Sequence, residues 1–446
     1  MKRHLAYFII CVFLFSSWNG KAQSWDSLGT GLKSTFASAL MEYNNHLFAA
    51  GHTVYGPSNH NGIYGISSWD GAHWTNPAPG LDSSIEYGAM ANYNGILYLT
   101  TIEYHSGGHS TRLASFNGTL WDTAWAHVQG YIYCMEVING KLCIGGQFTK
   151  VNGVLANNIA YWDGSVWSGF GSGTDSTVFA LADYNNNLVA AGRFYHAGGT
   201  SLLKIAQWDG FQWSGIGSGV ITQSGLSLIR LAVYNNNLYT AGSISSAGGI
   251  KTGNLACWNG SVWTSVGIDS NQFITSLLPY QGRLYVGGHY LGFALHLWGD
   301  LISWDGNNWS IPGTGIPSSG PGAPGGIYAL GTYKGNLIAT GAIDTAGGIP
   351  VLDIAQWGTP SAVYENVSIP GIQIFPNPSQ SLFHFEVEKE EHFNIEILNT
   401  YGESILIQKQ VRGSIDINLS DHPKGLYFYR ILNPDKILAS GKLILN

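Results

Sequence analysis

The chain has 446 residues and a formal net charge of −7, with 11% charged and 13% aromatic residues. This length is too great for a single ordinary core and leaves room for a large repeat domain and a smaller one. Because Lys2-Arg3 is the only basic cluster, the charge pattern argues against nucleic acid and anionic lipid as partners. The 60 glycines and the many Trp and Tyr residues favour an all-β protein with tight turns.

Residues 1–22 are predicted to be a secretory signal peptide. Basic Lys2 and Arg3 precede an apolar run, and the small residues Gly20 and Ala22 stand at positions −3 and −1 of a cut before Gln23. The apolar run is shorter than the roughly 20 residues that a membrane span needs. A short membrane anchor is the alternative, and we expect a mature chain without a transmembrane segment.

A short pattern that recurs along residues 24–358 predicts a repeat domain. Each copy has a Tyr or Ile, a polar pair, one further residue and an apolar position. The copies are EYNNHLF (42–48), NYNGILY (92–98), VINGKLC (137–143), DYNNNLV (183–189), VYNNNLY (233–239), PYQGRLY (279–285) and TYKGNLI (332–338). Asn-Asn and Asn-Gly pairs suit a type I′ hairpin turn, because both turn positions need positive φ.

A second landmark follows each hairpin at a nearly constant distance. It reads SWDGAHW (68–74), SFNGTLW (115–121), YWDGSVW (161–167), QWDGFQW (207–213), CWNGSVW (257–263) and SWDGNNW (303–309). Each repeat of about 50 residues therefore carries two hairpins and four strands, which we call a to d. Seven such repeats predict a seven-bladed β-propeller. We expect the tryptophans to pack between blades rather than to stack on a ligand.

The two ends of the repeat region complement each other. The seventh copy reads AQWGTP (355–360) and lacks its second Trp and last strand, whereas SWDSLGTGL (24–32) matches fourth-strand segments such as QWSGIGSGV (212–220). We expect this N-terminal strand to complete the seventh blade and close the ring, which removes open sheet edges. An open solenoid is the alternative.

The cysteines do not suggest a disulfide scaffold. Once Cys11 leaves with the signal peptide, the odd number Cys134, Cys143 and Cys257 remains. We expect buried thiols, with a Cys134–Cys143 bridge as the alternative.

The repeats resemble the kelch and galactose-oxidase-like propeller families and the propeller of Rax2-type cell-surface proteins. The double glycines Gly145-Gly146 and Gly287-Gly288 and the WDG turns carry this resemblance over residues 24–358. This resemblance implies a propeller fold and does not imply a catalytic activity. The kelch spacing of Tyr and Trp is not kept, and no residue matches the copper-binding Tyr and His of galactose oxidase by motif.

The composition changes after residue 358, since all 16 tryptophans precede it. A linker over 359–370 leads into alternating apolar runs such as FHFEV, FNIEIL and LYFYRI, which predict a small β-sandwich over 371–446.

This C-terminal end resembles the type A C-terminal sorting domain of the type IX secretion system of Bacteroidota. The resemblance rests on four segments: FPNPS (375–379), NTYGE (399–403), PKGLYF (423–428) and GKLI (441–444). The motif residues in them are Pro376, Asn377, Pro378, Gly402, Gly425, Tyr427, Gly441 and Lys442. The resemblance implies Sec export, the type IX machinery as a partner, and removal of the domain with release or surface anchoring. The protein would then be secreted or lie on the outer cell surface. A sandwich module that stays attached is the alternative.

The sequence carries no phosphate-loop, zinc, EF-hand or GxSxG motif. His105 and His109 have no nearby third ligand, and the Asp of each WDG turn lacks the neighbouring carboxylates that a hard cation needs. We therefore expect no metal, no cofactor and no catalytic residue.

The connections between strands b and c are longer than the hairpin turns and lie on one face of the ring, where loops on a rigid scaffold usually bind ligands. The candidate ligand-binding residues on them are His52, Tyr55, Tyr104, His105, Phe148, Arg193, Tyr195, His196, His289, Tyr290 and Trp298. Aromatic and polar side chains suit contacts with a glycan or a protein.

We therefore expect a binding protein of the cell surface or the medium. A secreted polysaccharide-acting enzyme is the alternative, although these loops are poor in the paired acids that glycosidases need, with only Glu103, Asp300 and Asp344. A purely structural surface component is a third possibility.

Overall fold

All regular elements in the described parts of the chain are β-strands. The computed structural model describes residues 23–29, 31–55, 65–75, 77, 86–105, 108–222, 229–268, 273–289, 299–317, 326–358, 372–387, 392–399, 404–433 and 436–445. The predicted signal peptide (1–22) and linker (359–370) lie outside the described residues. Residues Ser24–Gly358 form one compact unit, and the later strands belong to a second unit. The prediction of an all-β protein is confirmed.

In the first unit, the repeats fold as antiparallel sheets whose strands follow the chain from a to d. The first sheet has β2 (Lys33–Tyr43), β3 (His46–Tyr55), β4 (Ile66–Trp69) and β5 (Trp74–Thr75). Later sheets have β14 (Val178–Tyr184), β15 (Asn187–Gly192), β18 (Ile205–Trp208) and β19 (Trp213–Gly215); β21 (Ile229–Tyr234), β22 (Asn237–Gly242), β25 (Leu255–Trp258) and β26 (Trp263–Ser265); and β27 (Phe273–Tyr280), β28 (Arg283–His289), β29 (Leu301–Trp304) and β30 (Trp309–Ser310).

One sheet joins two repeats through a single long strand. Its order is β6 (Glu86–Tyr93), β7 (Ile96–His105), β8 (Gly108–Phe116), β9 (Trp121–Ile138), β10 (Lys141–Val151), β12 (Ile159–Trp162) and β13 (Trp167–Gly169), with β11 (Val154–Leu155) on β10. The 18 residues of β9 serve as strand d of one repeat and strand a of the next. The glycine-rich segment that breaks the chain after other d strands, such as SGFGSG at 168–173, is missing here.

The strand at the N-terminus completes the last sheet of the unit. Strand β1 (Ser24–Ser27) pairs antiparallel with β35 (Ile354–Gly358), outside β32 (Asn336–Ala342) and β31 (Gly326–Tyr333). The predicted pairing of the N-terminal segment with the seventh copy is therefore confirmed.

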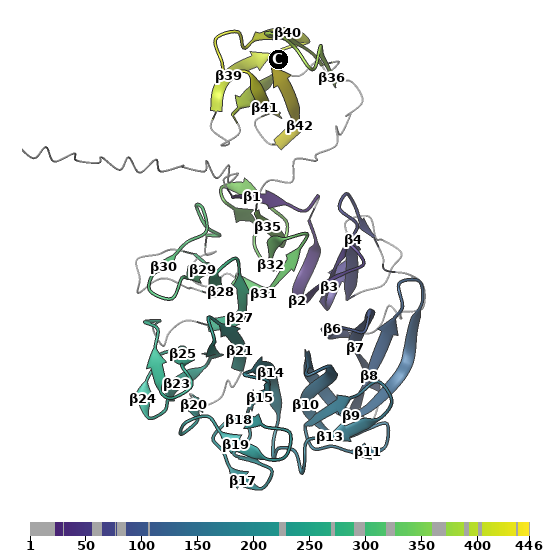
Figure 1. Ribbon diagram of the computed structural model, residues 1–446. Coiled ribbons are helices and arrows are strands. Elements are labelled where there is room, and N and C mark those ends of the chain that lie inside the picture. The colour runs from purple at the N-terminus through teal and green to yellow at the C-terminus, as the bar shows by residue number, and fades with distance from the viewer. Residues whose placement is uncertain are drawn as a thin grey trace, which may run out of the picture. The chain divides into compact units, whose positions relative to one another are not determined.

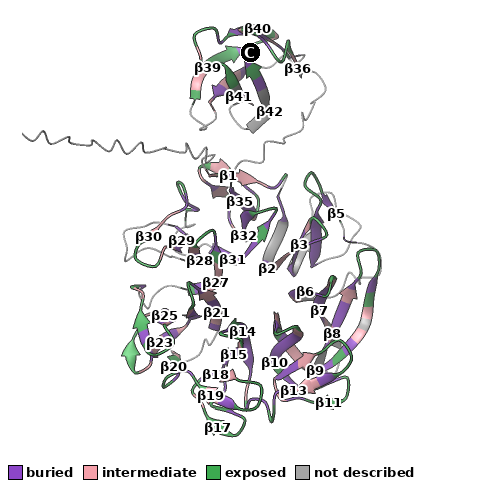
Figure 2. Cartoon of the chain, in the orientation of Figure 1, coloured by how far each residue is buried: buried purple, intermediate pink, exposed green. Residues whose placement is uncertain are grey.

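The a strands form a closed cycle at the centre of the unit. Contacts run from β31 to β2, β6, β9, β14, β21 and β27, and β27 contacts β31 again. Figure 1 shows the sheets arranged radially around these strands. This arrangement is a β-propeller. Strand β15 after Asn187 and residues 142–146 of β10 are buried (Figure 2).

The hairpin turns between strands a and b have the predicted conformation. Positive φ occurs at both turn positions in Asn44-Asn45, Asn185-Asn186 and Asn235-Asn236, and also in the Asn-Gly, Gln-Gly and Lys-Gly pairs that end with Gly95, Gly140, Gly282 and Gly335. These are the backbone angles of a type I′ turn.

The tryptophans of the WDG landmark pack between sheets, as the sequence predicts. The indole N–H of the second Trp donates to a carbonyl just past strand d of the preceding sheet, from Trp74 to Leu28 and from Trp213 to Phe170, both at 3.0 Å. Trp25 on β1 makes the same bond to Pro312, at 2.9 Å. Each bond satisfies a buried donor while it links two sheets.

The three cysteines of the first unit are free thiols as expected, and Cys143 and Cys257 are buried whereas Cys134 is half-buried. Cys143 lies opposite Glu136 and Cys134 opposite Gly145, so the two sulfurs sit diagonally across the β9–β10 ladder. Burial raises the pKa of Cys143 to about 12, which keeps the thiol neutral and unreactive.

The second unit contains two sheets around one core. The first is β36 (Ile372–Phe375), β37 (Leu382–Val387) and β40 (Ser414–Asn418), and the second is β39 (Ser404–Val411), β38 (Phe393–Leu398), β41 (Gly425–Asn433) and β42 (Lys436–Leu445). Phe383 and Phe385 from one sheet and Ile395, Ile431 and Leu443 from the other belong to the same buried cluster. This is the predicted β-sandwich.

Candidate functional site

The structure separates the predicted candidate residues into three groups. One group lies at the ends of b strands, but the structure does not describe its side chains: His52, Tyr55, Tyr104 and His105. Tyr290 and Trp298 lie outside the described residues. Arg193, Tyr195 and His196 are exposed between β15 and β18, and His289 is half-buried at the end of β28.

Phe148 is a correction to this candidate set. Its side chain is only 2% exposed and packs in a hydrophobic cluster with Ile132, Val151 and Ala156. The reason is that strand β10 extends into the expected loop as far as Val151, so residue 148 belongs to a strand and faces the core.

The b–c connections also share a structure that the sequence analysis missed. An Ala-Gly-Gly turn recurs between short strands: β16 (His196–Ala197) and β17 (Thr200–Ser201), β23 (Ile244–Ala247) and β24 (Ile250–Lys251), and β33 (Thr345–Ala346) and β34 (Ile349–Pro350). The Ala-Gly-Gly triplets at 197–199, 247–249 and 346–348 could have predicted this turn from the sequence.

These hairpins are fixed against the body of the propeller. The amide of the first glycine donates to the connection from the preceding sheet, as in Gly198 to Gly173 O at 2.9 Å and Gly347 to Gly315 O at 2.8 Å. A Cβ on Gly198 would lie 2.9 Å from the Trp213 ring, so only glycine allows this close approach. Strand β20 (Val220–Thr222) additionally pairs with β23. The face that carries these connections is therefore rigid at its rim.

Tyr195 and His196 are held by a carboxylate below them. Asp175 Oδ1 accepts hydrogen bonds from both backbone amides, and Asp175 Oδ2 lies 2.8 Å from His196 Nδ1. Burial opposes ionisation of Asp175, but the His196 side chain and these amides hold the pKa of Asp175 below its usual value. The Lys204 ammonium lies 4.6 Å from the centre of the Tyr195 ring. Tyr195 remains 53% exposed and available to a ligand.

Bulges in the a strands present further side chains at the same face. The register between strands a and b shifts by one residue in several sheets, and the residues at these bulges are Tyr133, Phe179, Thr275 and Tyr328. Each of these residues stands five positions before the last residue of its strand, away from the a–b turn. A bulge breaks the regular alternation and re-aims the side chain. These residues therefore lie toward the b–c ends of the a strands, a level that we call the mouth of the ring.

Tyr131, Tyr133, Phe179 and Arg193 form what we call the mouth cluster. The rings of Tyr131 and Tyr133 are stacked at 5.8 Å with 23° between their planes, and Tyr133 lies 5.3 Å from Phe179. The Arg193 guanidinium carbon is 5.4 Å from the centre of the Phe179 ring. Tyr133 is 44% exposed, so one aromatic surface beside a cation faces solvent.

Only Arg193 of this cluster was among the predicted candidates. The analysis of the sequence sought ligand-binding residues in loops, whereas the three aromatic residues belong to a strands. The sequence feature that could have revealed them is an aromatic residue five or more positions before the a–b turn.

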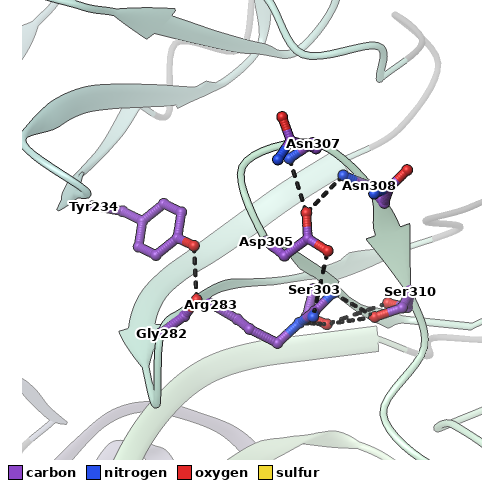
Figure 3. Close-up of polar contacts among 8 residues, drawn as sticks. All are labelled: Tyr234, Gly282, Arg283, Ser303, Asp305, Asn307, Asn308 and Ser310. Atoms are coloured by element: carbon purple, nitrogen blue, oxygen red, sulfur yellow. Dashed lines mark hydrogen bonds and ion pairs between the residues drawn. The ribbon is translucent and has the colours of Figure 1, made fainter. Parts of the chain in front are cut away.

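The opposite face uses its polar side chains to build turns. Figure 3 shows Asp305 accepting from the amides of Asn307 and Asn308, while Arg283 donates to Ser303 and Ser310 at 3.0 and 2.7 Å. This explains why the WDG turns resemble a calcium loop only superficially. In the described residues no group of three His, Cys, Asp or Glu side chains could hold a metal ion.

A cavity of about 150 Å³ also opens on that face, between β9–β13 and β14–β19. It lies where Ile138 replaces the recurring Tyr, and the Asn139 side-chain amide donates instead to Asn186 O at 2.8 Å. Lys141 fills part of its wall, with Nζ 4.0 Å from the centre of the Tyr161 ring.

The sorting-motif residues of the second unit hold its termini together. Ser379 N donates to Ile444 O, and Ile444 N donates to Asn377 Oδ1 at 2.9 Å, so the FPNPS segment lies on β42. The peptide bonds before Pro376 and Pro378 are cis, and Gly425 has a φ of 146°. The Tyr427 hydroxyl donates to Pro423 O. Gly441 and Lys442 belong to β42, and Gly402 lies outside the described residues.

Comparison with known proteins identifies this C-terminal unit. Residues 373–446 match the family model described as "Secretion system C-terminal sorting domain". The protein therefore carries a type IX sorting domain and is secreted or attached to the outer cell surface. No helix among the described residues has the length and apolar character needed to cross a membrane.

Several solved structures resemble the chain at low identity, and no curated protein sequence matches it. PorZ, an essential bacterial surface component of the type IX secretion system of Porphyromonas gingivalis, is 13% identical with a TM-score of 0.41; the match covers 93% of this chain and 60% of PorZ. A fungal alcohol oxidase of the AA5 family, in complex with copper, is 12% identical with a TM-score of 0.44, over 96% and 99% of the two chains. The β-propeller domain of the Trilobed protease from Pyrococcus furiosus is 8% identical with a TM-score of 0.42, over 73% and 95%.

Proposed function

We propose that the protein is a secreted, glycan-binding β-propeller whose ligand lies against the mouth cluster on the b–c face. The observation that carries this proposal is the exposed ring of Tyr133, which stacks on Tyr131 and rests on buried Phe179, with Arg193 beside it. An aromatic face buries the apolar face of a sugar ring, and polar groups at its edge take the hydroxyls.

The rigidity of this face supports the same proposal. The bulges fix the aromatic residues in strands, and the Ala-Gly-Gly hairpins are hydrogen-bonded to neighbouring sheets. A site that is already ordered loses little conformational entropy on binding. Tyr195 and His196 would extend the contact outward from the mouth.

We propose further that the ring has seven blades of the kelch-like or Rax2-like kind. The closed cycle of a strands and the completion of the last sheet by β1 support this count. In the mature protein the sorting domain would be removed after transport, with release or anchoring of the propeller.

A polysaccharide-acting enzyme is less well supported by the acids present. An acid pair for glycoside hydrolysis needs carboxyl groups about 5–9.5 Å apart in an accessible site. Of the acids considered from the sequence, Asp300 is 1% exposed and therefore inaccessible.

The test is retention of the purified full chain on a broad glycan array, with a parallel assay for released sugar. Selective retention without release supports the proposal. A blank array would overturn it in favour of a protein ligand or a structural role, and released sugar would restore the enzyme hypothesis.

A further inference from the structure

The third repeat lacks the aromatic pair that stands beside the a–b turn in other repeats. In the first, second, fifth and sixth repeats a Tyr on strand a packs against an aromatic residue on strand b, as in Tyr234 and Tyr239 with 5.9 Å between ring centres. Ile138 and Cys143 take the same positions of the ladder in the third repeat. Both line the cavity of about 150 Å³ between β9–β13 and β14–β19. The cavity thus adjoins the two positions at which rings are missing.

The glycine of the neighbouring c–d turn shows that the place of the missing hydroxyl is open. A Cβ on Gly164 would lie 3.4 Å from the hydroxyl of Tyr93 in the preceding repeat. The corresponding distance is 3.5 Å for Gly260 and Tyr184. A Cβ on Gly210, the equivalent glycine that lines the cavity, would meet no described atom within 4 Å. The space that a tyrosine hydroxyl takes in those repeats is therefore free beside Gly210.

The carbonyl oxygen that accepts the tyrosine hydroxyl elsewhere is also present at this cavity. Tyr234 donates to Gly282 O, in the second position of the next a–b turn. The equivalent carbonyl here is that of Asn186, which lines the cavity and accepts a hydrogen bond from Asn139 Nδ2 at 2.8 Å. A carbonyl oxygen has two lone pairs, so Asn186 O can accept a second hydrogen bond.

The walls of the cavity suit one aromatic ring. Its inner side chains are apolar or uncharged and each is 5% exposed or less: Ile138, Cys143, Phe170 and Leu188. The residues at its rim are exposed and polar or small: Asn139, Asn186, Asp209 and Gly210. An apolar cavity of roughly this volume is large enough for one benzene ring. A ligand with an apolar ring and one hydroxyl at its edge therefore matches both parts of the site.

We propose that this cavity binds a small phenol, whose ring lies against Ile138 and whose hydroxyl donates to Asn186 O. The ring replaces the side-chain ring that the third repeat lacks, and the hydroxyl replaces that of the recurring tyrosine. A free monocyclic phenol and the tyrosine side chain of a peptide share this chemistry. The site lies on the face opposite the mouth cluster and does not depend on the proposed glycan binding.

The test titrates the full chain with 4-fluorophenol and with 4-fluoroanisole and follows both ligands by fluorine NMR. The two ligands have the same ring, but the anisole has no hydroxyl to donate. We expect the wild type to bind the phenol at least about fivefold more tightly, which corresponds to one hydrogen bond.

Two variants locate the site. Ile138→Tyr should abolish binding of both ligands, because the new side chain restores the recurring tyrosine and fills the cavity. Val262→Tyr is the matched control, because it adds the same side chain at a 55% exposed c–d turn position in another repeat and should leave both affinities unchanged. Should Ile138→Tyr not fold, Ile138→Phe brings a ring without the hydroxyl and should also abolish binding.

Three results would overturn the inference: no binding of 4-fluorophenol to the wild type, equal affinity for the phenol and the anisole, or binding that persists when residue 138 carries a ring. A further arm adds the tripeptide Gly-Tyr-Gly as a competitor. Displacement of 4-fluorophenol would identify a peptide tyrosine as a ligand, and the lack of displacement would limit the site to free phenols. A blank glycan array leaves each of these outcomes unchanged, so the two proposals fail separately.

Discussion

At the scale of single residues, a tyrosine that precedes the a–b turn links neighbouring sheets in several repeats. Its hydroxyl donates to a carbonyl in the turn of the next repeat, from Tyr234 to Gly282 O at 2.7 Å (Figure 3) and from Tyr280 to Gly335 O at 2.8 Å. Tyr333 in the last repeat donates in the same way to Asn45 in the first, at 2.9 Å. One recurring bond thus both spaces the sheets and closes the ring.

Tyr333→Phe should lower the free energy of unfolding by about 1 kcal/mol, because Asn45 O loses its hydrogen-bond donor. Urea denaturation measures the change. Tyr195→Phe is the control, since Tyr195 is exposed and its hydroxyl should contribute little. Equal stability of the two variants would show that the closing bond adds nothing.

The WDG turns predict a loss of stability in acid. The amides of Gln212 and Phe211 donate to Asp209 and hold the pKa of Asp209 below its usual value. A group whose pKa is lowered on folding stabilises the protein above its unfolded pKa of about 4, and that contribution disappears as the pH falls through the folded value.

Asp209→Asn should therefore reduce the fall in melting temperature between pH 5 and pH 2. Asparagine can replace the carboxylate here, because Asn117 and Asn259 accept the equivalent amide bonds in other repeats. An identical pH profile for the variant and the wild type would contradict a role for this carboxylate in acid unfolding.

At the scale of elements, the sequence predicts the turns and the closing strand well and the bulges poorly. Asn-Asn and Asn-Gly pairs reveal the type I′ turns because few other residues accept positive φ. A bulge has no such requirement for a residue type, so the exposure of Tyr133 could not be predicted from alternation. The same limit explains Phe148, where the sequence does not mark how far β10 extends into the expected loop.

Strand β1 is the element on which closure depends. Trp25 is only 7% exposed, its ring lies 5.3 Å from that of Trp357, and its indole N–H is bonded to Pro312 O. Trp25→Ala should cost about 3–5 kcal/mol in the free energy of unfolding, as for other buried aromatic residues.

Denaturant unfolding of the full chain would measure this cost. Phe211→Ala is the control, because Phe211 is 90% exposed and its removal should change stability by less than about 0.5 kcal/mol. If Trp25→Ala were as stable as Phe211→Ala, β1 would not be the strand that holds the ring closed.

At the scale of the whole molecule, the sorting domain is one unit and the propeller, to which we assign the proposed binding, is the other. The sorting motifs could be identified in the sequence because their residues occupy constrained positions, such as Gly425 at positive φ and Asn377 on the terminal strand. The propeller also follows from its repeats. The proposed binding surface does not, because its aromatic residues come from two a strands, β9 and β14, which only the packing of neighbouring sheets brings together.

The most direct test of the account compares the full chain with Tyr133→Ala and Phe211→Ala on the same glycan array. Both changes remove one exposed aromatic side chain, on the b–c face and the opposite face respectively. We expect the wild type and Phe211→Ala to bind alike and Tyr133→Ala to lose at least about tenfold in affinity. Equal retention of all three proteins, or loss with Phe211→Ala alone, would contradict a glycan site at the mouth of the ring.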